Sequence, residues 1–181
     1  MTQESLLPPV SSDPRYESYL ERAKPLMPNT YIRKFVAKDF QRMVRAAWAS
    51  VDEVVTAVSG TELIQVHSPL GKCVCVTCGA VCKWEGSYNA IDAGHFVDSR
   101  EASIVFEETN VAPQCKSCNG KKGRGGNPQA YWLWMDHTYG REEIERLMRL
   151  KETTRRFTIE ELVVRRLGYK DRLAEYVSKL S

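Results

Sequence analysis

The chain has 181 residues, of which 43% are hydrophobic, and its formal net charge is +3. This size and composition fit one folded domain, and so small a positive charge does not establish a nucleic-acid partner. There is no apolar run of about 18 residues, and the N-terminus lacks the basic and then apolar order of a secretory signal, so we expect a cytoplasmic protein without a membrane span.

Helix signals begin after a polar lead-in. Residues 1–13 contain Ser, Pro and charged side chains without periodicity, and we expect them to be disordered. Asp13 followed by Pro14 is typical of a helix start, and this helix should stop at Pro25.

Two further helices are predicted before residue 61. Over residues 30–50, apolar side chains recur at helical spacing and leave Lys and Arg outside. Ser50 with Glu53 matches a capping box, which predicts another helix that reaches Gly60. We assign these helices to dimerisation or DNA contact.

The middle of the chain has a β-type rather than a helical sequence pattern. Residues 62–112 contain short β-type runs separated by Gly, Asn and Ser, which predicts a small, irregular β-rich region. These runs are ELIQV at 62–66, CVCV at 73–76 and SIVF at 103–106.

Helices resume towards the C-terminus. Asn127 and Pro128 should begin one helix that Gly140 ends, and Thr158 with Glu161 should cap a long last helix. The sequence therefore predicts an α+β fold in four segments. They are a disordered lead-in at 1–13, a helical region at 14–61, a compact core at 62–127 and a second helical region at 128–181.

Four cysteines form two Cys-x-x-Cys pairs on either side of a 36-residue loop. They are Cys75 with Cys78, and Cys115 with Cys118. Two residues between cysteines let a tight turn aim both thiolates at one ion, and two such turns complete the four-sulfur shell of structural zinc. Because a cytosol keeps thiols reduced, we favour zinc over disulfides or four plainly buried thiols.

Two cysteines remain outside these pairs. We expect Cys73 and Cys82 to act as small hydrophobic side chains. Cys73 alternates with Cys75 along a predicted strand, so it stays an alternative ligand.

The 36-residue loop between the two cysteine pairs, together with the residue that follows the second pair, contains polar side chains suited to phosphodiester hydrolysis. Asp92 and His95 lie on IDAGHFV, Asn110 follows, and Asn119 comes directly after the last cysteine. A carboxylate and an amide oxygen can hold a hard divalent cation, a second amide can orient an imidazole, and the imidazole can take a proton from water. The alternative for His95 is a structural histidine in a module that only grips DNA.

A basic segment lies beside these residues. It comprises Lys116, Lys121, Lys122 and Arg124 among glycines, which let backbone approach phosphate closely. We interpret it as a nucleic-acid contact, and the alternative is an ordinary solvated loop.

The ordered series DAGHF, FEETNV, QCKSCN and GN before an aromatic helix resembles the HNH nucleases, and specifically the phage lambda NinG family, also called Rap. The resemblance covers about residues 70–165, and the Asn that follows Cys-x-x-Cys is also similar to phage endonuclease VII. It implies a ββα-metal nuclease core with a four-cysteine zinc site between N- and C-terminal helices.

The resemblance assigns residue roles. His95 would be the general base, Asn110 the residue that positions it, and Asn119 a ligand of a catalytic Mg²⁺ or Mn²⁺. Asp92 would be the other ligand, although many HNH sites place that ligand directly before the histidine, where this chain has Gly94.

The resemblance also implies a substrate and an assembly. It predicts a phage- or prophage-encoded endonuclease, acting in the bacterial host cell, that nicks Holliday junctions and displacement loops without a small-molecule substrate. Two symmetric nicks favour a homodimer. The apolar stripe of the last helix fits either a dimer interface or packing onto its own core. The alternatives are an HNH endonuclease for ordinary duplex DNA and a non-catalytic, zinc-dependent junction-binding protein.

Overall fold

The computed structural model describes residues 12–98, 103–120 and 127–180, so the expected disorder of residues 1–13 lies almost wholly outside the described residues. Three helical segments precede the strands: α1 (Tyr16–Ala23), α2 (Pro28–Tyr31) with the π-helical η1 (Ile32–Val36), and α3 (Ala37–Ala49). The strands are β1 (Glu53–Ser59), β2 (Glu62–Ser68), β3 (Lys72–Val74), β4 (Val81–Lys83), β5 (Asp92–His95) and β6 (Val111–Gln114). The other helices are η2 (Glu108–Asn110), α4 (Lys116–Asn119), α5 (Pro128–Lys151) and α6 (Ile159–Ser178).

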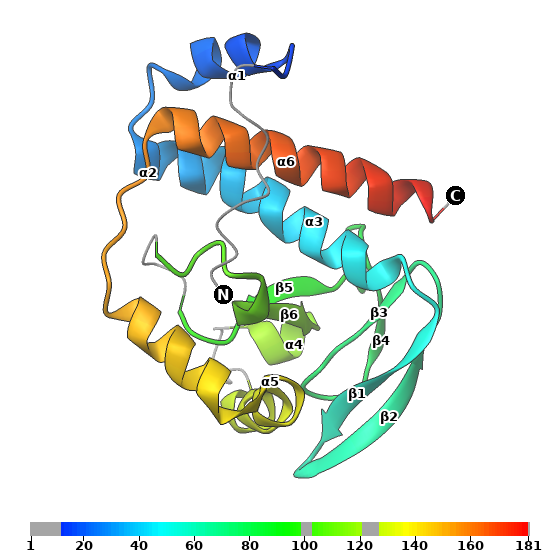
Figure 1. Cartoon of the computed structure of the whole chain (residues 1–181). Helices are drawn as coiled ribbons and strands as arrows, with labels where there is room; N and C mark the ends of the chain where they lie inside the picture. Colours follow the sequence, from blue (N-terminus) through cyan, green and yellow to red (C-terminus); the bar gives the residue numbers. More distant parts are fainter. Residues whose placement is uncertain (1–11, 99–102, 121–126, 181) are drawn as a thin grey trace.

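Helix α3 is central to the molecule (Figure 1). It lies along α6 on one side, with α1 packed against α6, and it contacts β3, β5 and β6 on the other side. The strands form three antiparallel hairpins, β1–β2, β3–β4 and β5–β6. The α+β class predicted from the sequence is therefore correct.

The first helices follow the sequence signals closely. Helix α1 begins at Tyr16, where the Asp13 carboxylate accepts the backbone N–H of Arg15 at 2.8 Å, and it ends before Pro25. The helix expected over residues 30–50 is also present, although its first part is π-helical rather than α-helical. The apolar face of α3 is buried, as its periodicity predicted.

The helix predicted from Ser50 to Gly60 is wrong. The Ser50 hydroxyl donates to the Ala47 carbonyl at 2.8 Å and so ends α3 instead of starting a helix. Residues 53–59 form β1, because the β-branched run VVT favours extended backbone and the segment pairs with β2. Gly60, with φ 62°, makes the turn between the two strands.

Backbone hydrogen bonds join the hairpins to one another. The N–H of Val58 donates to Val76 at 2.9 Å, and the N–H of Val76 donates to Pro113 at 3.0 Å. This chain of contacts runs from β1, past the segment after β3, to β6. The relative positions of the hairpins are thus fixed by main-chain contacts as well as by side-chain packing.

Two of the three predicted strand segments contribute strands, and the third does not. Residues 62–66 lie in β2, and CVCV contributes β3, which ends at Val74. The SIVF segment is not a strand: it forms turns, and Ile104, Val105 and Phe106 are all buried. The apolar run predicts a strand, but three successive buried side chains can also belong to a turn that the protein core surrounds, and that is the case here.

Both C-terminal helices begin as predicted. The Asn127 side chain accepts the N–H of Ala130, and Thr158 and Glu161 form a complete capping box. At Gly140 the backbone is non-helical (φ 79°), so α5 consists of two helical segments, and the first of them ends there as predicted. A positive φ of this kind is accessible to glycine at low cost, so the chain kinks there and then continues as helix.

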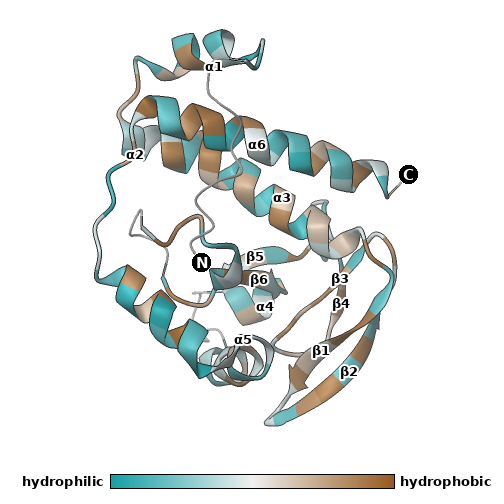
Figure 2. Ribbon diagram, in the orientation of Figure 1, coloured by the Kyte–Doolittle hydropathy of each residue, from teal (hydrophilic) through white to brown (hydrophobic). Residues whose placement is uncertain are grey.

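The apolar stripe of the last helix packs onto the protein's own core. Leu162, Val163, Leu167 and Leu173 are buried in one cluster with residues of α1 and α3. Figure 2 shows apolar patches alternating with polar ones along both α3 and α6. Of the two interpretations of this stripe, the structure supports internal packing. Within the described residues, no helix combines the length and apolarity needed to cross a membrane.

Candidate functional site

The two Cys-x-x-Cys segments fold into matching turns. After β3, the N–H groups of Cys78 and Gly79 point to the Cys75 carbonyl. After β6, the N–H groups of Cys118 and Asn119 point to the Cys115 carbonyl in the same way. Each turn therefore places its two thiols on one side, as the spacing predicted.

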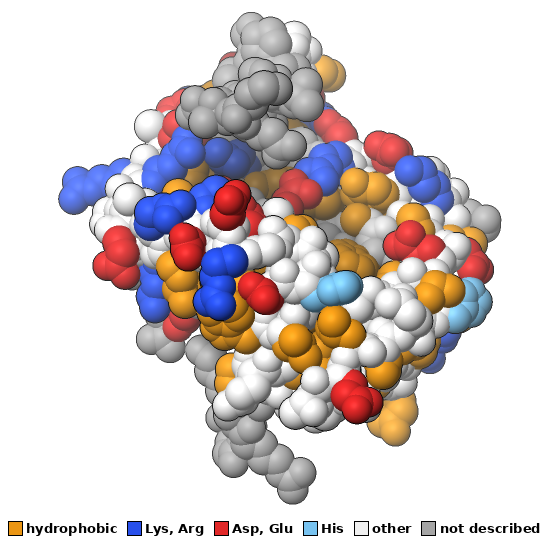
Figure 3. Space-filling model, turned by 60° about the horizontal axis from the view of Figure 1, so that its bottom comes forward, with side chains coloured by type: hydrophobic (Ala, Val, Ile, Leu, Met, Phe, Trp, Pro, Cys, Tyr) orange, Lys and Arg blue, Asp and Glu red, His pale blue; other side chains and the backbone are white. Residues whose placement is uncertain are grey.

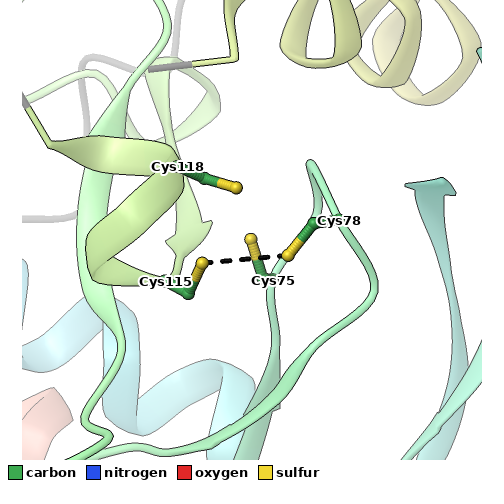
Figure 4. A group of neighbouring side chains, drawn as sticks. All are labelled: Cys75, Cys78, Cys115 and Cys118. Atoms are coloured by element: carbon green, nitrogen blue, oxygen red, sulfur yellow. Dashed lines mark hydrogen bonds between the residues drawn. The ribbon is translucent and has the colours of Figure 1, made fainter. Parts of the chain in front are cut away.

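The four sulfur atoms converge on one point (Figure 4). The Sγ atoms of Cys75, Cys78, Cys115 and Cys118 all lie within 4.8 Å of one another, and those of Cys78 and Cys115 are 3.8 Å apart. Zinc bound tetrahedrally at about 2.3 Å from each sulfur would set sulfur–sulfur distances near 3.8 Å. The donor set and its geometry therefore fit a structural zinc ion.

The surroundings of the cluster are partly apolar and partly hydrogen-bonded. Burial raises the pKa of the Cys118 thiol. It acts in the same direction on Cys115, but hydrogen bonds from Ser117 and the Cys118 backbone outweigh it and hold the Cys115 pKa at about 7. Thr77, fully buried, lies 3.3 Å from the Cys75 sulfur and accepts a hydrogen bond from Gln114 at 3.2 Å. These contacts hold the turn from Cys75 to Cys78, the first knuckle, in its orientation.

The two other cysteines stand apart from this cluster. Cys73 and Cys82 are cross-strand neighbours on β3 and β4, and both are buried. Burial raises the pKa of Cys73 to about 12, which keeps it protonated. Neither belongs to the group of sulfurs found among the described residues, so both are placed as small buried side chains.

Asp92 and Asn119 come together, although they are far apart in sequence. Asp92 begins β5, and Asn119 ends α4 directly after the second knuckle. The Asn119 amide nitrogen donates to Asp92 Oδ2 at 3.3 Å, and the Lys116 ammonium donates to Oδ1, also at 3.3 Å. Asp92 side-chain exposure is 34%, so solvent and a ligand can reach it.

His95 lies at the other end of β5, opposite Val111. Its Nε2 is buried and has no hydrogen-bond partner among the described residues. Burial lowers the pKa of His95, while hydrogen bonding to the Val105 backbone and the charge of Asp98 oppose that effect. The lowered pKa keeps the ring neutral at cellular pH, and a neutral imidazole has one nitrogen that can accept a proton.

Asn110 braces the backbone beside His95. It is fully buried; its Oδ1 accepts the N–H of Val97 at 2.8 Å, and its Nδ2 donates to the Val97 carbonyl at 3.1 Å. The main chain adds a bond from Phe96 N–H to the Asn110 carbonyl. Both polar atoms of the Asn110 amide thus bind the backbone of Val97, two residues after His95, and fix the path of the hairpin there.

Gly94 is a glycine because its position has no room for a side chain. A Cβ there would lie 2.1 Å from Gln114 Oε1, and the Gly94 carbonyl accepts the Tyr131 hydroxyl at 2.9 Å. A side chain before His95 would therefore displace Gln114, and Asp92 is the acidic residue on this strand.

The predicted site residues form two groups. Side chains alternate along a strand, so Asp92 and His95, three residues apart, point to opposite faces of β5. Asp92 groups with Asn119 and Lys116, whereas His95 groups with Asn110 at the other end of the strand. Within the described residues no hydrogen bond joins the groups. Of the predicted basic loop, Lys121, Lys122 and Arg124 lie outside the described residues.

Fold and site together define a small α+β protein built around a four-cysteine cluster able to hold a metal ion such as zinc. The chain belongs to the bacteriophage lambda NinG protein family, which it matches over residues 62–178. It is thereby related to proteins of phage recombination. No curated protein and no solved structure matches it. The match begins at β2 and includes α6, whereas the helices before β1 lie outside it.

Sequence reasoning missed three residues around the site. Gln114 and Thr77 connect the first knuckle to β6, and Arg45 of α3 has a buried Nε without a hydrogen-bond partner among the described residues. Spacing carries no signal for Gln114 or Thr77. Arg45 was grouped with the outward cations of its helix, yet it is half-buried.

Proposed function

We propose that this protein is a metal-dependent, structure-specific DNA endonuclease that nicks branched recombination intermediates. The observation that carries the proposal is the contact between Asp92 and Asn119, brought about by two strands and a short helix that the cysteine cluster holds in place. This order of strand, strand and helix, with those side chains at its ends, is what the resemblance to HNH nucleases predicts. Membership of the NinG family supports a substrate drawn from recombination.

Each of the four predicted site residues has a defined role in this proposal. Asp92 and Asn119 offer oxygen ligands, since rotation of the Asn119 amide turns its Oδ1 towards the carboxylate. A bound Mg²⁺ or Mn²⁺ would supply charge stabilisation on the phosphate. His95 Nε2, which is buried and has no partner among the described residues, would take a proton from the attacking water. Because Asp92 and His95 lie on opposite faces of β5, the proposal requires the His95 end of the strand to turn towards the cation when DNA binds. Asn110 keeps the hairpin in register.

The test compares the wild type with His95→Ala on labelled four-way junctions and linear duplexes, with Mg²⁺, Mn²⁺ or chelator. We expect cation-dependent nicking of the junction, and a loss of roughly 10²-fold or more in the variant, the size of a general-base contribution. Binding of the junction should be retained. His137→Ala is the matched control, because His137 is exposed on α5 and should leave cleavage unchanged.

The pH profile adds a second readout. Because the neutral imidazole is the active form and burial lowers the His95 pKa, the fall in rate on acidification should come at a lower pH than it would for an ordinary histidine. Equal cleavage of junction and duplex would instead indicate an endonuclease for ordinary DNA. Binding without cutting under every cation would leave a zinc-dependent junction-binding protein.

A further inference from the structure

Arg45 lies on α3, the helix that contacts β5, the strand that Asp92 begins. It is half-buried, and its buried Nε finds no hydrogen-bond partner among the described residues. Burial lowers the pKa of Arg45, and the charges of Asp92 and Glu85 oppose this effect. A buried guanidinium nitrogen without a partner is costly, and such atoms mark places where a ligand or water belongs.

The charges around Asp92 favour an anion. One carboxylate faces two cations, Lys116 at 3.3 Å and Arg45, with the neutral Asn119 amide beside them. With Arg42 and Glu85, which pair with each other, counted as well, three cations stand against two carboxylates, and this excess of one positive charge attracts phosphate. A phosphate would supply acceptors for the unfilled donor of Arg45, and it would bring negative charge for a cation at Asp92.

The positive charge continues along one face of α3. Lys38, Arg42 and Arg45 are four and then three residues apart, so they lie on the same side of the helix. We call these three residues the α3 cationic face. Lys38 is exposed and has no ion pair within the described part of the chain, while Arg42 pairs with Glu85 at 2.8 Å in an exposed contact. Exposed pairs of this kind are weak and exchange readily for phosphate.

The rest of α3 does not share this charge. On the side towards α6, Asp39 accepts from Arg166 at 2.7 Å and lies 3.8 Å from Lys170, so those charges are already paired. On the molecular face that Figure 3 turns forward, Lys and Arg are interspersed with Asp and Glu. The net charge of the whole chain is only +3. The α3 cationic face is therefore a local concentration of positive charge, and its last residue, Arg45, interacts electrostatically with Asp92 of the candidate site.

We infer that the α3 cationic face binds the phosphate backbone of DNA, with Arg45 and Lys116 on the phosphate that lies at Asp92. The inference rests on the proposed function for the identity of the ligand. It assigns a role to a helix outside the family-matched residues 62–178. Lys38 and Arg42 would contribute attraction along the strand, whereas Arg45 would position the phosphate at the site itself.

The test measures junction binding at several salt concentrations in buffer without Mg²⁺ or Mn²⁺, for Lys38→Gln, Arg42→Gln and Arg45→Gln. Each should bind several-fold more weakly and reduce the slope of log affinity against log salt by about 0.9 per lost phosphate contact. Arg22→Gln is the matched control, since Arg22 is an exposed arginine of α1, which lies beyond α6 from the strands. It should match the wild type. Arg45→Lys, which keeps the charge, should recover most of the slope.

Cleavage kinetics separate the two roles on this face. At saturating junction, Lys38→Gln should cut at the wild-type rate, whereas Arg45→Gln should cut at least about tenfold more slowly. The inference would be overturned if all three variants showed the same slope of log affinity against log salt as Arg22→Gln. This holds even if the protein cleaves DNA. If the wild type never cleaves, the proposed nuclease function fails, but the slopes still decide whether α3 contacts the backbone.

Discussion

At the scale of single residues, Gly94 shows how tightly the hairpin fits the zinc shell. A Cβ at Gly94 would lie 2.1 Å from Gln114 Oε1, and Gln114 is buried and held by Thr77, which contacts the Cys75 sulfur. Gly94→Ala must therefore displace Gln114 from its place. We expect it to lower the free energy of unfolding by about 1–3 kcal/mol, as overpacking typically does, in urea titrations of the zinc-loaded protein.

A double-mutant cycle checks the cause. If the clash with Gln114 is the reason, Gly94→Ala combined with Gln114→Ala should cost clearly less than the sum of the two single changes. Strictly additive costs would show that another contact of Gly94, such as its carbonyl with Tyr131, is responsible.

The residues of the candidate site were predictable to different degrees. Asp92 and Asn119 could be paired in advance because the flanking knuckles tie their segments together, and the structure places them 3.3 Å apart. The separation of His95 from Asp92 on opposite faces of β5 follows from strand alternation once the strand is known. Arg45 could not be foreseen, because its position depends on how α3 packs against β5 and not on local sequence.

At the scale of elements, local signals succeeded where they acted alone. Thr158 with Glu161 begins α6 as predicted, because a complete capping box needs nothing from the rest of the chain. Ser50 with Glu53 has the same spacing, but Glu53 is the first residue of β1. There the β-branched residues and the pairing with β2 outweigh the capping signal. A capping signal therefore misleads when the segment that follows it can pair with a neighbouring strand.

The four-cysteine cluster joins two hairpins, and the loss of a bound zinc ion should separate them. Cys75→Ser removes one of four ligands, so we expect zinc content to fall from about one ion per chain to near zero and the hairpins to lose order. Cys82→Ala is the matched control: a buried cysteine outside the cluster, whose change should keep the zinc. Metal analysis and far-UV circular dichroism give the two readouts. Full zinc retention by Cys75→Ser would contradict the assigned ligand set.

At the scale of the whole molecule, the helices share a core with the segment between the two cysteine pairs. Phe40 of α3 is fully buried and contacts the rings of Phe106, in the turn before η2, and Tyr169 of α6, with centroids 5.8 and 5.1 Å away. One aromatic side chain thus connects the N-terminal helices, the loop within the zinc-stapled segment and the C-terminal helix. These segments should unfold together.

Phe40→Ala tests this coupling. Removing a fully buried phenyl ring should lower the free energy of unfolding by about 3–5 kcal/mol, whereas Tyr88→Ala, at a side chain 85% exposed, should change it by at most about 0.5 kcal/mol. In urea, helix loss by circular dichroism and zinc release by a chromogenic chelator should shift together, because a single cooperative unit has one transition. If Phe40→Ala moves the helical transition but leaves zinc release at its wild-type midpoint, the helices and the metal-bearing hairpins are separate folding units, and α3 is not rigidly fixed against the candidate site.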